Sequence, residues 1–160
     1  MKSSKGFSLM ETIVVIAVVG IISAIAAPSI ISQRSNANLR DAVSMIRSDF
    51  EMARSRAIRE NAFVPVLISA DGYTIFIDNG PGAASGNWAS DVGERILCNA
   101  KLPPGIRIDL TQTTFTVDHR TRFDGRGYSA NAGILFVLSS NGKTATVDMN
   151  NRFGRITTAY

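Results

Sequence analysis

Residues 5–30, KGFSLMETIVVIAVVGIISAIAAPSI, decide how this chain is organised. From residue 7 to residue 27 the run is mostly apolar, and Glu11 is its only charged residue. As a helix rising about 1.5 Å per residue it is ~31 Å long, which matches a hydrocarbon core of about 30 Å. The run therefore predicts a membrane-spanning helix. A secretory signal peptide is the alternative, because residues 24–27 offer small side chains for cleavage, although its apolar region is usually only about 7–15 residues long.

The charge of Glu11 needs an explanation inside such a segment. A central carboxylate costs about 2.5–3.5 kcal/mol on insertion, whereas each Ile or Val returns about 0.3–0.6 kcal/mol, so insertion survives it. A charge in a membrane segment indicates a functional role, and we expect it to have a partner of opposite charge. The run contains no basic residue, so either Glu11 reaches the headgroups or another molecule supplies its partner.

Beyond residue 35 the helical pattern becomes amphipathic. The apolar positions recur at intervals of four and three residues and form one stripe: Leu39, Val43, Ile46, Phe50, Ala53 and Ala57. We expect this stripe to pack on the chain's own sheet rather than on a coiled-coil partner. The helix should end near Asn61, and Pro28 should kink or locally melt it near residues 24–27.

From residue 63 the pattern changes to short β-branched runs separated by turns. The predicted strands are residues 64–69, 73–78, 95–98, 106–110, 114–117, 134–139 and 143–148. Asp71-Gly72 and Asn141-Gly142 indicate hairpins, because both dipeptides tolerate the positive φ of tight turns. Residues 81–86 form a predicted loop, with Trp88 as its anchor. The fold class is α+β, a long N-terminal helix packed on a C-terminal antiparallel sheet.

Composition limits the chemistry. The chain of 160 residues carries a formal charge of +4 and one cysteine, Cys98, which excludes an intramolecular disulfide and a multi-cysteine metal site. We expect Cys98 to be a buried apolar residue. The sequence presents no nucleophile elbow, phosphate-binding loop or calcium loop. We predict no enzymatic activity, no cofactor and no metal.

The stretch KGFSLME, residues 5–11, resembles the leader and processing site of type IV pilins and type II secretion pseudopilins. The resemblance implies that a prepilin peptidase cuts after Gly6 and methylates the new N-terminus, Phe7. Counted from Phe7, Glu11 and Pro28 stand where the family has a glutamate and a proline. It also implies that Glu11 meets the N-terminal amine of a neighbouring subunit during docking, so that mis-registered subunits leave both charges unpaired.

A second resemblance lies in the C-terminal half. The turn at residues 123–127, the hairpin at residues 134–147 and Gly154-Arg155 are similar to the GspH/FimT class of minor pilins. In the resembled family, major pilins typically close a C-terminal loop with a cysteine pair or another staple; one cysteine cannot form the pair, which favours a minor subunit over a major one. The implied divisions are a leader (residues 1–6), a transmembrane or filament-core helix (7–28), an amphipathic helix (29–61) and an antiparallel β domain (62–160).

These resemblances imply a minor pilin or pseudopilin that primes or caps a type IV pilus or a type II secretion pseudopilus. Its partners would be the prepilin peptidase, other pilin or pseudopilin subunits and the bacterial inner membrane. It would cross that membrane once, with a periplasmic C-terminal domain, before entering a periplasmic or extracellular filament. A major filament subunit is a further alternative.

A DNA-binding minor pilin for natural transformation is the alternative of another class. Some members of the class bind DNA through a C-terminal glycine-arginine-x-arginine, which stops at Gly154-Arg155 in this sequence. The candidate DNA-binding residues are Arg126, Arg152 and Arg155, in a region with more basic than acidic residues. We favour the interpretation in which these arginines make salt bridges and subunit contacts.

Overall fold

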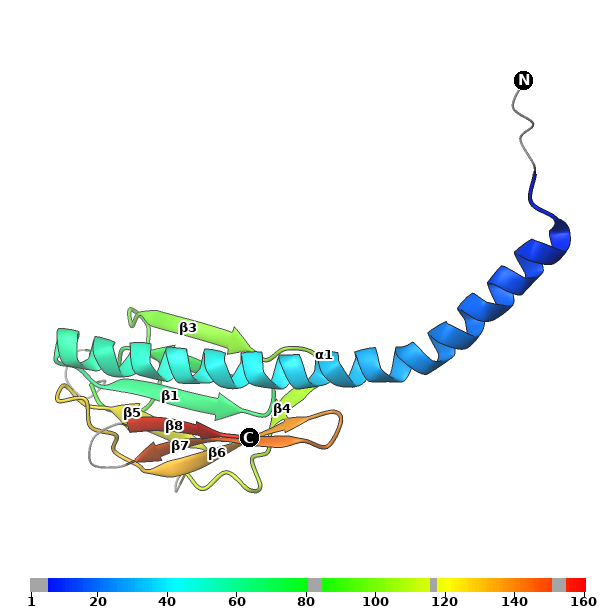
Figure 1. Cartoon of the computed structure of the whole chain (residues 1–160). Coiled ribbons are helices and arrows are strands. Elements are labelled where there is room, and N and C mark those ends of the chain that lie inside the picture. The colour runs from blue at the N-terminus through cyan, green and yellow to red at the C-terminus, as the bar shows by residue number, and fades with distance from the viewer. Residues whose placement is uncertain (1–5, 81–84, 116–117, 151–154) are drawn as a thin grey trace. The chain divides into compact units, whose positions relative to one another are not determined.

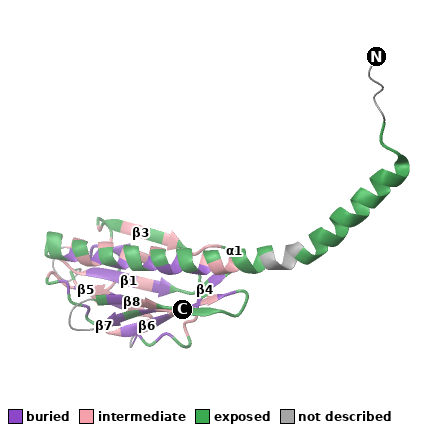
Figure 2. Ribbon diagram, in the orientation of Figure 1, coloured by how far each residue is buried: buried purple, intermediate pink, exposed green. Residues whose placement is uncertain are grey.

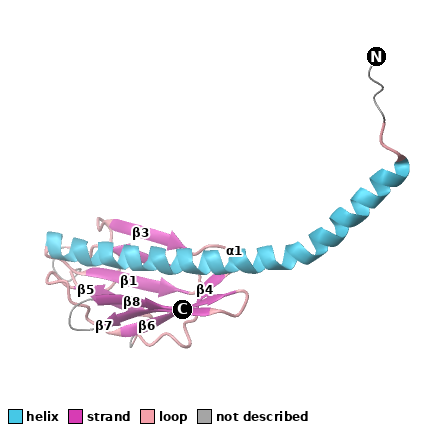
Figure 3. Cartoon of the chain, in the orientation of Figure 1, coloured by secondary structure: helices cyan, strands magenta, loops and turns pink. Residues whose placement is uncertain are grey.

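The computed structural model describes residues 6–80, 85–115, 118–150 and 155–160, and the chain divides into two compact units, Met1–Arg34 and Ser35–Tyr160. Helix α1 (Leu9–Glu60) starts in the first unit and continues into the second, which also holds all the described strands (Figure 1). Figure 3 shows this succession of one helix and then strands. The predicted α+β layout is confirmed.

Local signals set both ends of α1. The Ser8 hydroxyl accepts a hydrogen bond from the Glu11 backbone N–H at 3.3 Å, so Ser8 is the N-cap. At the other end Asn61 has φ 47°, and the Ala62 N–H donates to the Ala57 carbonyl at 3.2 Å. This is a Schellman closure with asparagine in the left-handed position. The helix thus ends where the sequence predicts.

The strands form two four-stranded antiparallel sheets in the second unit, ordered β3-β2-β1-β5 and β4-β6-β7-β8. Their bounds are β1 (Val64–Ser69), β2 (Gly72–Phe76), β3 (Ile96–Lys101), β4 (Ile106–Ile108), β5 (Arg120–Phe123), β6 (Gly133–Ser139), β7 (Thr144–Asn150) and β8 (Arg155–Ala159). Strand β4 also reaches the first sheet, because the Ile108 N–H donates to the Ala70 carbonyl at 2.8 Å.

The core lies between the second half of α1 and the sheets. All six residues of the predicted stripe are buried, and Ala42 is buried with them. Figure 2 shows the buried positions recurring along one side of this part of the helix. Phe50 meets Tyr73 of β2 edge-to-face, with ring centroids 5.8 Å apart. The prediction that the stripe packs on the chain's own sheet is confirmed.

One predicted strand is wrong, and two observed strands were not predicted. Residues 114 and 115 are not in a strand, because Asp109 accepts hydrogen bonds from Thr111 and Gln112 and holds the preceding segment in a turn. Residues 116 and 117 of that predicted strand lie outside the described residues. Strands β5 and β8 were not predicted. Each has few apolar residues; β5 gains its hydrogen bonds from β1, which is distant in sequence, and β8 gains them from the preceding strand β7.

Both predicted hairpins form, but their glycines act differently. Gly142 has φ 81° in the β6–β7 turn, as the dipeptide predicts. Gly72 has no positive φ and is the first residue of β2. A Cβ there would lie 2.1 Å from the Ala100 carbonyl oxygen of β3. Gly72 is therefore needed for close strand approach rather than for the turn.

Candidate functional site

The first part of α1 presents apolar side chains to its surroundings on every side. One described helix, α1, is long and apolar enough to cross a membrane, and none of its most apolar window is buried. The exposed large apolar residues of this part of α1, together with Phe7 just before it, are Phe7, Leu9, Met10, Ile13, Val14, Val15, Ile16, Val18, Val19, Ile21, Ile22, Ile25, Ile30 and Ile31. A helix that is apolar all round requires lipid or other protein surfaces around it.

Glu11 is the third residue of α1, in its first turn. The unpaired N–H groups of that turn favour a nearby carboxylate by about 0.3–1 kcal/mol. Ser8-x-x-Glu11 also has the capping-box pattern, a signal that the sequence analysis missed. Within the described residues the Glu11 carboxylate has no ion-pair partner. Its docking role stays a prediction.

The residues around the expected cleavage point precede the helix. Gly6 and Phe7 are exposed and lie outside regular structure, and a Cβ on Gly6 would meet nothing within 4 Å. Phe7 is 82% exposed. A peptide bond in such a segment needs no helix unwinding to enter a peptidase.

Pro28 lies within the continuous helical span Leu9–Glu60, so the local melting considered for residues 24–27 does not occur in this structure. A proline in a helix interior removes one backbone donor and clashes with the preceding turn. The kink at Pro28 stays a prediction.

Arg155, one of the candidate DNA-binding arginines, does not lie near Lys143, another exposed basic residue described in this region. Arg126 is exposed in the turn after β5, near the end of α1, and Arg155 is exposed at the start of β8, opposite Asn150. Lys143 precedes β7, whose seven residues separate it from Arg155 by ~24 Å at about 3.4 Å per residue. Arg152 lies outside the described residues. DNA binding stays a prediction.

The turn after β5 closes over the end of α1. One Asp124 carboxylate oxygen accepts from the backbone N–H groups of Arg126 and Tyr128, each at 2.9 Å. Arg54 of α1 donates from Nε to the Gly127 carbonyl at 3.1 Å. A Cβ on Gly125 would lie 2.4 Å from the Asn61 side-chain oxygen, so glycine permits this contact.

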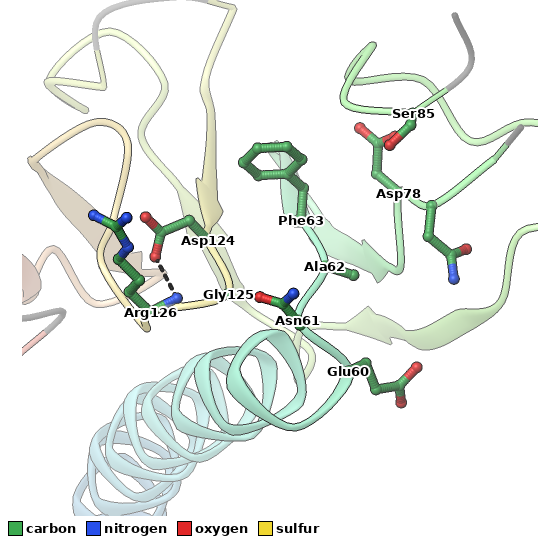
Figure 4. A pocket seen from close by; sticks show the side chains of 10 residues that line it. Glu60, Asn61, Ala62, Phe63, Asp78, Ser85, Asp124, Gly125 and Arg126 are labelled. Atoms are coloured by element: carbon green, nitrogen blue, oxygen red, sulfur yellow. Dashed lines mark hydrogen bonds between the residues drawn. The ribbon is translucent and has the colours of Figure 1, made fainter. Parts of the chain in front are cut away.

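A hollow of about 440 Å³ lies beside this turn (Figure 4). Its acidic residues already hold other groups. Asp78, which is fully buried, accepts from the Gly86 and Trp88 N–H groups, and Glu60 pairs with Arg56 and Arg95. In Figure 4 Asp124 and Arg126 lie on one side of the Phe63 ring, and Asp78 and Ser85 lie on the other. The geometry is that of a junction holding loops to the helix end.

Cys98 is half-buried rather than buried, because it lies on β3, an edge strand. Its Sγ lies 3.5 Å from an Asp49 carboxylate oxygen that also accepts from the Tyr73 hydroxyl at 2.6 Å. Burial, together with the Asp49 charge and hydrogen bond, raises the pKa of the Cys98 thiol to about 11. Burial and the same carboxylate also raise the pKa of Tyr73. The thiol is thereby held in its unreactive protonated form.

Comparison with protein families finds a match in the C-terminal part of the chain and another in its N-terminal part. The model for type II transport protein GspH matches residues 42–152, which make up most of the β domain and the helix packed on it. The chain belongs to the GspH family. The model for the prokaryotic N-terminal methylation motif matches residues 1–27. No curated protein and no solved structure matches the chain.

Membership of the GspH family makes this chain a minor pilin or pseudopilin subunit of a type II secretion system or a type IV pilus. Members of such families are structural subunits, processed by prepilin peptidase and assembled with other pilins. The exposed apolar part of α1 fits an anchor in the inner membrane. The methylation-motif match covers the apolar N-terminal segment, and the GspH match covers most of the amphipathic part of α1 and the β domain.

Proposed function

We propose that this GspH-family chain primes or caps a type II secretion pseudopilus or a type IV pilus. In this proposal it is cleaved after Gly6, methylated on Phe7 and docked through Glu11. Before assembly it spans the inner membrane once, with the β domain in the periplasm. The observation that carries the proposal is the apolar, fully exposed segment of α1 that contains one carboxylate without an ion-pair partner in the described chain.

The docking step follows from the electrostatics of that carboxylate. An ion pair withdrawn from water gains little net stability, but leaving one partner alone is strongly unfavourable, by about 3–5 kcal/mol. A new subunit whose amino group reaches Glu11 removes this penalty, and one that is displaced along the helix does not. The charge therefore selects register among apolar helices that would otherwise pack in many positions.

Processing is tested by intact-mass analysis of the protein from cells with and without the prepilin peptidase. We expect the mass of residues 7–160 plus one methyl group when the peptidase is present, and the uncleaved chain when it is absent. Cleavage near residue 27 would contradict the proposal, because it would release a secreted domain.

Docking is tested with Glu11→Gln and Glu11→Ala. Glutamine keeps the length and the capping geometry of the side chain but removes its charge. We expect both variants to insert into the membrane normally and to be absent from sheared filaments. Normal incorporation of Glu11→Gln would show that Glu11 acts by capping α1, and would overturn docking through its charge.

Priming or capping is separated from a bulk structural role by filament counts. Deletion of a priming subunit reduces the number of filaments, and deletion of a capping subunit changes their length. A major subunit, in contrast, makes up most of the mass of the filament. A copy number close to that of the bulk subunit would overturn the minor role in assembly.

A further inference from the structure

A second hollow, of about 230 Å³, opens where α1 enters the second unit. Its lining comes from three places in the chain that the fold brings together: α1, the β6–β7 hairpin and the residue after β8. The lining residues are Asn36, Leu39, Arg40, Lys143, Thr144 and Tyr160.

Polar contacts fix the walls of this hollow. The Ser35 and Ser139 hydroxyls lie 2.7 Å apart, and Asn141 donates from its side-chain amide to the Asn36 oxygen at 3.0 Å. The Lys143 N–H donates to the Asn141 side-chain oxygen at 3.2 Å. These contacts join the hairpin to α1 and position the backbone that carries Lys143. The bond from Asn141 occupies the side-chain oxygen of Asn36, so the side-chain N–H groups of Asn36 remain for a ligand.

The lining has the chemistry of an anion site. Arg40 and Lys143 are exposed and come from different elements, and neither forms an ion pair within the described residues. The Asn36 amide and the Thr144 hydroxyl add neutral donors, and among the described residues no Asp or Glu side chain lines the hollow. Guanidinium, ammonium, amide and hydroxyl donors together suit the oxygens of a phosphate group.

The position of the hollow along the chain selects the source of that phosphate. Ile31, the last large apolar residue of the exposed run, precedes Asn36 by only five positions. Five residues span at most ~18 Å in any conformation and ~7.5 Å as helix. The polar zone on each side of a bilayer is about 5–7 Å thick. When the exposed apolar residues down to Ile31 occupy the membrane, with this longer span tilted to fit the hydrocarbon core, the hollow is within reach of the lipid headgroups.

We propose that this hollow binds the phosphate of an anionic phospholipid headgroup. Arg40 and Lys143 neutralise its charge, and Asn36 and Thr144 donate to its oxygens. The proposal rests on the membrane anchoring described under the proposed function. It adds a lipid contact that holds the base of the β domain at the membrane surface before the subunit is extracted into a filament.

The test uses the full chain purified in detergent, with lipid binding followed by native mass spectrometry. The probes are phosphatidylglycerol, phosphatidylcholine and inorganic phosphate. Each basic residue near a lipid surface contributes about fivefold in affinity, so Arg40→Gln with Lys143→Gln should weaken phosphatidylglycerol binding by roughly 30-fold. The matched control is Arg47→Gln with Lys101→Gln, which removes two exposed basic residues, one on α1 and one on a strand, outside the hollow.

We expect the control pair to bind phosphatidylglycerol like the unmodified chain, and phosphatidylcholine to bind weakly to all three proteins. Equal losses in the two variant pairs would overturn the site, because charge alone would then explain binding. Inorganic phosphate that competes at the same concentration as phosphatidylglycerol would overturn the lipid source. Thermal unfolding of each protein shows whether the substitutions leave the fold intact.

These results are distinguishable from failure of the proposed function. Normal processing and filament incorporation with no lipid selectivity would overturn only the lipid site. Selective lipid binding by a chain that is never cleaved after Gly6 would overturn only the assembly role.

Discussion

Replacing Gly72 by alanine should damage the fold in a way that its dipeptide does not predict. Asp71-Gly72 reads as a turn in which glycine supplies positive φ, yet Gly72 has no positive φ. An added Cβ would lie 2.1 Å from the Ala100 oxygen and 3.3 Å from the Lys101 Cα, both on the backbone of β3. Strands β2 and β3 would therefore have to separate by about 1 Å, since contacts below ~3 Å are not tolerated.

The expected loss follows from the hydrogen bonds that such a separation breaks. The Leu102 N–H donates to the Asp71 carbonyl at 3.0 Å, next to the point of contact. Losing two or three bonds at about 1 kcal/mol each, less about 0.4–1 kcal/mol gained by restricting the unfolded chain, leaves a net loss of about 2 kcal/mol. For a protein of this size that lowers Tm by about 4–8 °C.

Gly142→Ala is the matched control. Gly142 has φ 81° and nothing within 4 Å of an added Cβ. Its cost is the left-handed backbone alone, about 1–2 kcal/mol before the same unfolded-state gain. We therefore expect a Tm lower by only about 1–4 °C.

Thermal unfolding of the full chain in detergent, followed by circular dichroism, measures both variants. Amide hydrogen exchange locates the damage: β3 should exchange faster in Gly72→Ala and at the normal rate in Gly142→Ala. Equal changes in Tm with unchanged exchange in β3 would refute the strand-contact explanation and restore the turn explanation.

Two further predictions concern the β domain. Asp49→Asn should increase the rate at which iodoacetamide alkylates Cys98 at pH 8 by several-fold, because the Asp49 charge helps to raise the thiol pKa and a lower pKa gives more thiolate. The pH dependence of alkylation measures this, and an unchanged profile would assign the raised pKa to burial alone. Arg122→Lys should expose Trp88, the only tryptophan, because the Arg122 guanidinium lies 4.2 Å from the Phe63 ring centroid and 4.3 Å from that of Trp88. A lysine cannot reproduce this planar stack, so acrylamide should quench Trp88 fluorescence more strongly, and unchanged quenching would contradict the anchoring role.

The elements that the sequence predicts well are those whose signal repeats locally. The stripe on α1 recurs through six positions from Leu39 to Ala57, so a single ambiguous residue cannot hide it. Strand β5 has only four residues, and two of them are arginines. Its alternation of half-buried and buried side chains exists only because β1 lies alongside and Arg122 stacks on Phe63 and Trp88. Such a strand depends on tertiary contacts that a local pattern does not contain.

The two candidate sites differ in the same way. Gly6, Phe7 and Glu11 stand within six positions of one another, so the family motif contains the whole processing segment. The hollow at Arg40 and Lys143 is assembled across the fold, where Asn36 and Asn141 are 105 residues apart. No spacing rule joins those positions. The reason for Gly72 is equally invisible in sequence, since the Ala100 carbonyl comes close to it only after β2 and β3 pair.

The capping of α1 changes what the proposed docking has to achieve. Ser8 caps the helix by accepting from the Glu11 backbone N–H, and the unpaired N–H groups of this first turn favour a negative charge, so the helix end partly stabilises the carboxylate before a partner arrives. A neighbouring amino group adds an ion pair to this stabilisation, and an ion pair withdrawn from water gains little net stability. The net gain in affinity is then small, while the penalty for an unpaired amine or carboxylate among apolar helices remains large. On this reasoning the Glu11 pair determines which register is accepted, and the exposed apolar surface of α1 provides the affinity.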